Sequence, residues 1–302
     1  MDRIPTWERV LTMIFVWAPP VVLVWGIVNF WNEGVNTLSL TLFASFVLGT
    51  GLGVTVGFHR LFTHKSFETF PFVGYLLAIL AMFSAQKSVY EWVAIHRKHH
   101  QYSDKIGDPH SPHLHGGGVK GLVLGFIHAH VGWFSGKLLD EKDYIIDLKR
   151  DGVLAVISAL YPFWVILGLI LPAFIAFSVT GSTHEAFLGF IWGGVIRLGV
   201  VYHITWSVNS VCHIWGYRRF ETSDHSTNQF FVGLVGFGEG WHNNHHAEQK
   251  WARHGIYWWE VDLSWYLICL LGWLRLAWDI RIPTAEEIEA RKKTLEARRV
   301  LT

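Results

Sequence analysis

Long apolar segments constrain the fold of this chain most, because about 20 mostly apolar residues are enough for a helix to cross a bilayer. Four such segments predict transmembrane helices, at residues 10–30, 38–56, 153–179 and 186–208. The chain is 51% hydrophobic and only 16% charged, whereas a soluble domain carries roughly a quarter charged residues. The sequence therefore predicts an all-α membrane protein, and its formal net charge of +1 gives no reason to expect a nucleic-acid partner.

Basic residues predict which side of the membrane each connection occupies. All 25 Lys and Arg residues except Arg197 fall before the first predicted span, between the second and third, or after the fourth. Because Lys and Arg are enriched in cytoplasmic loops, we expect both termini and residues 57–152 and 209–302 on the cytoplasmic side. This requires the shorter apolar stretch at 70–85 to lie at the interface as a helix rather than cross. Residues 1–302 are then one multi-pass domain with a cytoplasmic helical cap.

Histidines are unusually numerous, at 18 in the chain, and many of them form three tight clusters. Residues i, i+3 and i+4 share one helical face, so each cluster of three is expected to direct its imidazoles toward one point. Imidazole binds iron, zinc, copper and nickel, and the three clusters offer more ligands than one ion takes. A lone histidine in a membrane protein is more often a satisfied polar group, but three clusters on one predicted side favour a two-metal site. The clusters are His59 with His64, then His96 with His99 and His100, and finally His242 with His245 and His246.

Further polar residues extend this predicted site. His213 follows Asn209 by four residues, so both face one side of a helix that continues the fourth span. The run from His110 to His115 is expected to be a loop. Buried carboxylates commonly hold the second ring nitrogen of a ligating histidine. The candidates for that role are Asp104, Asp108, Asp224 and Glu239.

These motifs resemble those of the integral-membrane fatty acyl desaturases, and within them the stearoyl-CoA (delta-9) desaturase type. That family carries one His-x4-His motif, two His-x2-His-His motifs and an Asn-x3-His motif, and all are present in order between about Leu38 and His254. The flanking segments that also match are Gly57-Phe-His59-Arg, Val89-Tyr-Glu-Trp92, Gly107-Asp-Pro-His110, His130-Val-Gly-Trp133 and Glu239-Gly-Trp-His242-Asn-Asn-His245-His246.

The resemblance implies a reaction, a cofactor and its ligands. Enzymes of this family use oxygen and a di-iron centre to introduce a cis double bond into a saturated acyl chain, between carbons 9 and 10 in the stearoyl type. Nine histidines hold the two irons, and an asparagine reaches one iron through water. The residues at the matching positions are His59, His64, His96, His99, His100, His213, His242, His245, His246 and Asn209.

The resemblance also implies a bent, buried tunnel for the acyl chain, with polar residues at its bend. The matching positions are Gln86, Trp92 and Thr205. Val47 and Gly51 precede His59 in the second predicted span, so they are expected near the closed end of the tunnel, where chain length is set.

The sequence does not determine which acyl carrier the enzyme uses. Animal acyl-CoA enzymes of the family have an Arg-Asp pair that contacts the CoA head group, and Ala94 and Ile95 replace that pair here. CoA, an acyl carrier protein and an intact membrane lipid are therefore all compatible. Since the sequence has no remaining segment for a haem or flavin domain, we expect electrons from a separate ferredoxin, cytochrome b5-like or reductase protein.

Two other functions compete with this interpretation. A membrane di-iron hydroxylase of an alkane, sterol or carotenoid shares histidine clusters, but commonly with other spacings and with Glu-containing motifs that are missing here. A non-enzymatic membrane metal binder or transporter would place its ligands within the spans, whereas these clusters fall at or beyond the span ends. A metalloprotease is disfavoured, because the sequence contains no His-Glu-x-x-His motif.

Overall fold

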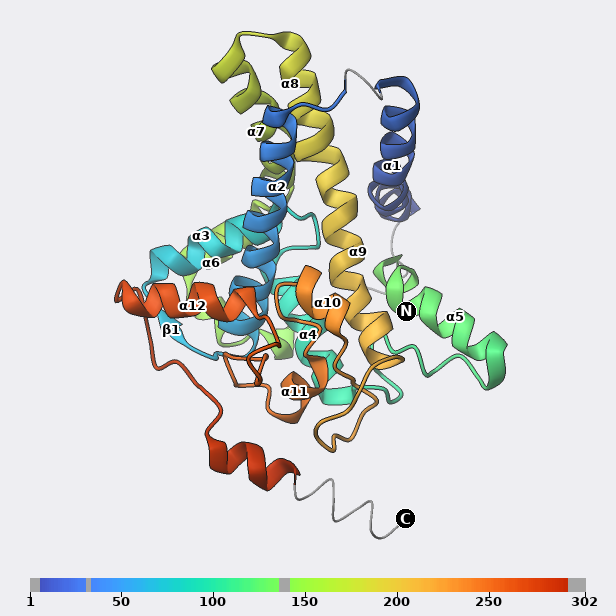
Figure 1. The fold of residues 1–302 in the computed structure, drawn as a ribbon, viewed down its shortest axis with the longest axis vertical. Coiled ribbons are helices and arrows are strands. Elements are labelled where there is room, and N and C mark those ends of the chain that lie inside the picture. Colours follow the sequence, from blue (N-terminus) through green and yellow to red (C-terminus); the bar gives the residue numbers. More distant parts are fainter. Residues whose placement is uncertain (1–5, 31–33, 136–141, 293–302) are drawn as a thin grey trace. The chain divides into compact units, whose positions relative to one another are not determined.

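The computed structural model describes residues 6–30, 34–135 and 142–292. Helices dominate the described residues (Figure 1), and the two short strands β1 (Glu68–Thr69) and β2 (Ala277–Trp278) form one antiparallel ladder. The chain divides into two compact units. The first contains Met1–Val54, Tyr75–Trp92 and Phe134–His203, and the second contains Thr55–Gly74, Val93–Trp133 and Ile204–Thr302.

The first unit is a bundle of apolar helices. Helix α7 packs against α8 and the π-helix η5, and α2 and α1 also pack on η5. Small residues permit this approach, since a Cβ at Gly194 would lie 2.6 Å from the carbonyl oxygen of Leu169. The elements of this unit are α1 (Thr6–Phe30), α2 (Thr37–Leu52), most of α3 (Pro71–Met82), η3 (Lys142–Tyr144), η4 (Leu148–Arg150), α6 (Gly152–Ala159), α7 (Tyr161–Thr180), α8 (Thr183–Gly189), η5 (Phe190–Ile196) and the first half of α9 (Arg197–Ser210).

Three helical segments among the described residues are long and apolar enough to cross a membrane. They are Thr37–Thr63, Tyr161–Thr180 and Thr183–His213. The predicted spans 38–56 and 186–208 therefore lie within longer continuous helices. The predicted span 10–30 is helical as α1, but only its part Val16–Gly26 forms a shorter apolar helix by the same criterion, so a fourth span stays a prediction.

The candidate span in the range predicted at 153–179 begins later, at Tyr161. Helix α6 ends at Ala159, Leu160 has φ −80° and ψ 15°, and α7 begins with Pro162 in its first turn. Proline lacks the N–H that would continue the hydrogen-bond ladder, and its ring clashes with the carbonyl one turn earlier. The helix therefore restarts, and the 20 residues of α7, about 30 Å long, are sufficient to cross by themselves.

Arg197 faces the protein interior, as expected for an arginine within a span. Its side chain is fully buried and donates three hydrogen bonds to backbone carbonyls. Nε reaches Gly193 at 3.0 Å, Nη1 reaches Phe83 at 2.6 Å and Nη2 reaches Gly168 at 2.8 Å. These bonds satisfy the guanidinium away from water and give it a role in holding the bundle together.

The second unit carries all of the clustered histidines. Its elements are the π-helix η1 (Gly53–Thr63, from Thr55 onward), the start of α3, most of α4 (Val89–Tyr102), α5 (Gly118–His130), the first residues of η2 (Gly132–Ser135), the end of α9, η6 (Val211–His213), α10 (Phe230–Val235), α11 (His242–Ala247), α12 (Leu263–Trp273) and the two strands. The segment His110–His115 is a loop, as predicted. The stretch predicted to be interfacial contains α3, whose 12 residues are too few to cross a bilayer.

Candidate metal centre

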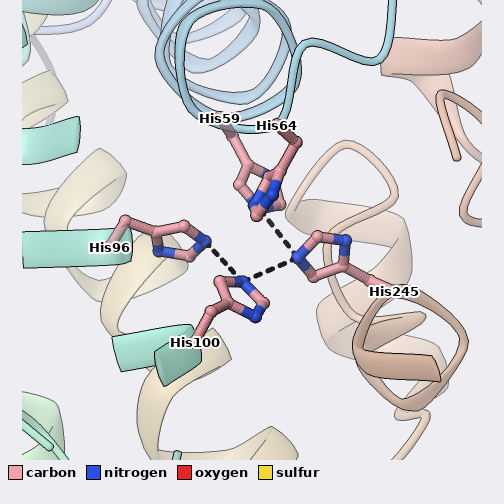
Figure 2. Close-up of side chains that lie close together, drawn as sticks. All are labelled: His59, His64, His96, His100 and His245. Carbon is pink, nitrogen blue, oxygen red and sulfur yellow. Dashed lines mark hydrogen bonds between the residues drawn. The ribbon is translucent and has the colours of Figure 1, made fainter. Parts of the chain in front are cut away.

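Imidazole rings of the second unit gather into two groups, and the candidate ligand atoms within each group lie within 4.8 Å of one another. Figure 2 shows the five rings of the first group converging from η1 and its end, α4 and α11. The first group contains His59, His64, His96, His100 and His245, and the second contains His99, His213, His242 and His246. Together they are the nine histidines selected from the sequence. That they ligate metal stays a proposal, taken up below.

A π-helix explains the five-residue spacing of the first motif. In η1 the backbone N–H of His64 donates to the carbonyl of His59 at 3.1 Å, which is the i→i+5 bond of a π-helix. Residues five apart then lie close to one face, and the two ring centroids are 4.7 Å apart. In an α-helix the same spacing would turn the rings away from each other by more than a quarter turn.

The expectation that each cluster of three converges on one point is wrong. His96 and His100 join the first group, whereas His99 joins the second. At about 100° per residue, neighbouring residues such as His99 and His100 point in directions about 100° apart, so one helix serves two centres. Helix α11 divides in the same way: His245 joins the first group, while His242 and His246 join the second.

Each of the four predicted carboxylates contacts the Nδ1 atom of one clustered histidine. A carboxylate only accepts hydrogen bonds, so each Nδ1–H donates and Nε2 of the same ring carries its lone pair. This arrangement fixes the tautomer needed for metal ligation through Nε2. The pairs are His59–Glu239 at 2.7 Å, His99–Asp108 at 3.0 Å, His213–Asp104 at 2.8 Å and His246–Asp224 at 2.7 Å.

Burial keeps several of these rings neutral. Burial, reinforced by neighbouring imidazoles, lowers the pKa of His100 and His245 well below the ordinary value. Burial also lowers the pKa of His246 to about 4, although Asp224 opposes this shift. Neutral imidazole is the form that binds metal, so these side chains are in the ligating form at neutral pH.

The two asparagines between the histidines of α11 are fully buried and hold this helix in place. Asn243 Oδ1 accepts from the backbone N–H groups of Arg219 and Phe220, at 2.7 and 2.8 Å. Asn244 Nδ2 donates to the carbonyl of His254 at 2.8 Å, and its Oδ1 accepts from the Arg219 side chain at 3.1 Å. A helix of six residues is not stable alone, so these bonds orient its three imidazoles.

The donor atoms fit a metal ion in each group. Two ligand atoms that each lie about 2.1 Å from a metal and meet it at right angles are about 3 Å apart. Several Nε2 pairs lie at that separation: His59–His245, His96–His100, His100–His245 and His213–His242 are all 3.0 Å apart. The Nε2 atoms of His64, His99 and His246 are buried without a hydrogen-bond partner among the described residues. An all-imidazole donor set suits iron, zinc, copper or nickel.

Two buried histidines beside the centre escaped prediction. His254 Nδ1 lies 3.0 Å from Arg60 Nη2 and 3.3 Å from Glu239, and its ring centroid is 4.6 Å from that of His245. The ring of His110 stacks on that of His99 at 4.3 Å. His254 belongs to no histidine motif, and His110 only ends the matching segment Gly107-Asp-Pro-His110, so their contacts beside the centre arise from tertiary packing.

The remaining predicted site residues are distributed over both units. Asn209 is half-buried near the end of α9, and its water-mediated contact to iron stays a prediction. In the first unit, Gln86 and Gly51 are buried, and Val47 and Trp92 are half-buried. Thr205 is half-buried in the second unit. A tunnel lined by these residues is therefore a proposal.

Comparison with known proteins agrees with the chemistry of this site. The family model described as "Fatty acid desaturase" matches residues 36–278. The chain therefore belongs to the fatty acid desaturase family, an oxidoreductase family of lipid metabolism, and this confirms the resemblance found in the motifs.

The chain is similar to relatives that act on different substrates. An sn-1 stearoyl-lipid 9-desaturase of Synechocystis sp. is 40% identical over 245 residues, which cover 80% of this chain and 71% of the relative. A hex-5-enoyl-[acyl-carrier protein] acetylenase of Moorena producens is 38% identical over 277 residues, covering 91% and 86%. An acyl-CoA C20 Delta5-desaturase of Anemone leveillei is 37% identical over 262 residues, covering 84% and 76%.

Proposed function

We propose that this chain is an oxygen-dependent acyl desaturase that introduces a cis double bond into a saturated acyl chain by means of two iron ions. The observation that carries this proposal is the pair of all-imidazole groups, of which Glu239 supports the first through His59 and three aspartates support the second. The first group would hold one iron. The second group would hold the other, together with a water bound by Asn209.

The reaction needs an oxidant that no side chain can supply. Iron held by these histidines would supply it from O2 with two external electrons and two protons; the acyl chain would lose one hydrogen from each of two adjacent methylene carbons, and O2 would be reduced to two water molecules. The protein's own residues orient four of the proposed ligands: carboxylates hold the Nδ1–H of His59, His99, His213 and His246, and Nε2 of each of these rings keeps its lone pair. Burial of the rings excludes bulk water from the donor atoms.

Substrate placement is the second task of the protein. We propose that Gln86, Trp92 and Thr205 line the bend of an acyl tunnel, and that Val47 and Gly51 lie toward its closed end. A bent apolar tunnel admits one conformer of a flexible chain and holds one C–C bond beside the oxidant. By analogy with the relatives named 9-desaturases, we place the double bond between carbons 9 and 10.

The acyl carrier in this proposal is CoA or a membrane lipid. Ala94 is fully buried and Ile95 is half-buried, so neither offers a polar contact to a CoA head group at the position of the Arg-Asp pair of animal enzymes. The relatives' own names include lipid, CoA and carrier-protein substrates. We further propose a cytoplasmic active site, supplied with electrons by a ferredoxin, a cytochrome b5-like protein or a reductase.

Expression in a host that lacks such an enzyme tests the proposal. Gas chromatography with mass spectrometry of separated lipid classes and acyl thioesters reports the unsaturation, its position and the carrier together. His99→Ala is expected to abolish the product while leaving membrane insertion intact, because it removes one ligand of the second group. An oxygenated product would favour a hydroxylase, and metal uptake without any lipid change would favour a metal binder.

A further inference from the structure

The outer side of α12 carries an uninterrupted row of apolar side chains. We call this row the α12 face: Leu263, Tyr266, Cys269, Leu270 and Trp273. These positions recur at three- and four-residue spacing, and Trp273 is 79% exposed. The inner side of the helix is buried through Ser264 and Ile268. A helix at a water-facing surface would carry polar residues on its outer side, so this face is suited to an apolar environment.

Exposed aromatic rings continue the apolar surface of this part of the unit. Helix α12 contacts β2, whose Trp278 packs edge-on against Phe70 with ring centroids 5.0 Å apart. Phe70 in turn stacks on Phe72 at 6.0 Å, and all three rings are exposed. The β1–β2 ladder, with Glu68 opposite Trp278, holds these segments together.

A hydrogen bond ties α12 to the end of a candidate membrane span. Ser264 Oγ, in the first turn of α12, donates to Thr55 Oγ1 at 2.7 Å, and this contact is buried. Thr55 belongs to the span Thr37–Thr63. The 16 residues of α2 rise about 24 Å, and Thr55 follows α2 by three residues, so its distance from the start of the span is close to the hydrocarbon thickness of about 30 Å. The first turn of α12 therefore lies near the depth at which hydrocarbon gives way to head groups.

We propose that α12 lies in the membrane interface with the α12 face inserted into lipid. Its 11 residues, about 17 Å, are too few to cross a bilayer, and Trp and Tyr are the residues enriched at membrane interfaces. Arg275 follows the helix and is exposed, where its guanidinium suits lipid phosphates. The position of α12 at the membrane does not depend on iron binding or on desaturation. A failure of this proposal would therefore leave the proposed function untouched, and the reverse also holds.

The native cysteines provide the probe. Cys269 is exposed on the α12 face, whereas Cys212 is buried, so a nitroxide label attaches selectively to Cys269 in the full-length protein. The labelled protein is reconstituted at low density into vesicles of phosphatidylcholine and phosphatidylglycerol. Electron paramagnetic resonance power saturation then measures how often the nitroxide collides with each of two reagents. Oxygen concentrates in lipid, whereas nickel ethylenediaminediacetate stays in water.

Lipid insertion predicts that oxygen collisions exceed nickel collisions at Cys269, and that Trp273→Asp shifts the balance toward nickel. A matched label at Glu286→Cys in a Cys269→Ser background should favour nickel, because Glu286 is exposed on the charged C-terminal segment. Dominant nickel collisions at Cys269 would overturn the proposal in favour of a water-facing helix. Low collision rates with both reagents, together with dipolar broadening between labels, would overturn it in favour of a second copy of the chain.

Discussion

Asp224→Asn tests how a carboxylate controls the second histidine group. Asp224 Oδ2 contacts His246 Nδ1 at 2.7 Å, and Oδ1 accepts from Ser226 N at 3.0 Å, Ser226 Oγ at 2.6 Å and Thr222 Oγ1 at 2.7 Å. The backbone N–H of Ser226 can only donate, so the amide oxygen of Asn must stay at the Oδ1 position. The amide NH₂ then faces His246 Nδ1, which must accept, and the ring proton moves to Nε2.

A protonated Nε2 cannot ligate metal, so His246 would bind only by breaking this new hydrogen bond. Loss of a supporting group of this kind typically lowers metal affinity by about 10- to 100-fold, equivalent to about 1.4–2.8 kcal/mol. Titration of purified apoprotein with Fe²⁺ under anaerobic conditions, read by competition with a chelator, measures the effect. We expect one of two iron-binding steps to weaken by that factor while the other is unchanged.

The matched control is Asp151→Asn, which removes the same charge. Asp151 caps α6 and accepts from Tyr75, and it contacts none of the nine histidines, so both iron-binding steps should keep wild-type affinity. If Asp224→Asn binds two irons as tightly as the wild type, the reasoning that the carboxylate sets the tautomer of His246 is refuted.

Three further predictions follow from the same geometry. Arg197→Met should lower the free energy of unfolding of the detergent-solubilised protein by about 2–4 kcal/mol, because the buried carbonyls of Phe83 and Gly168 lose charged donors. The melting temperature should therefore fall, and an unchanged melting temperature would contradict this. The apoprotein should lose stability as pH falls from about 6.5 toward 4, since the unfolded chain takes up a proton at His246 that the folded chain excludes; equal melting temperatures at pH 7 and pH 5 would count against the burial of this ring. Chelation should abolish desaturation and Fe²⁺ should restore it, whereas restoration by Zn²⁺, which has no redox chemistry, would exclude the proposed oxidation.

Much of the fold could be predicted from local patterns in the sequence. Apolar length predicted the helices at 38–56 and 186–208, and histidine spacing selected eight of the nine rings that the structure brings together, while the resemblance to the desaturases added His213. Hydropathy could not show the break at Leu160, because Tyr161 and Pro162 do not interrupt an apolar run although proline interrupts the hydrogen-bond ladder.

The division of the nine rings between two centres could not be predicted from the sequence, for a different reason. Spacing places His96, His99 and His100 on one broad face of α4, but the angle between adjacent residues decides which ring meets which centre. That choice depends on where η1 and α11 pack beside α4. The same tertiary packing brings His254 beside Glu239, although the two residues belong to no common motif.

In the proposed enzyme, the nine imidazoles hold two irons that oxidise an acyl chain. Elemental analysis of the purified full-length protein, paired with Mössbauer spectroscopy and product formation on the same sample, tests it most directly. We predict two irons per chain in the active protein and loss of product in His99→Ala. Full activity with a single metal per chain, or with zinc in place of iron, would contradict the account.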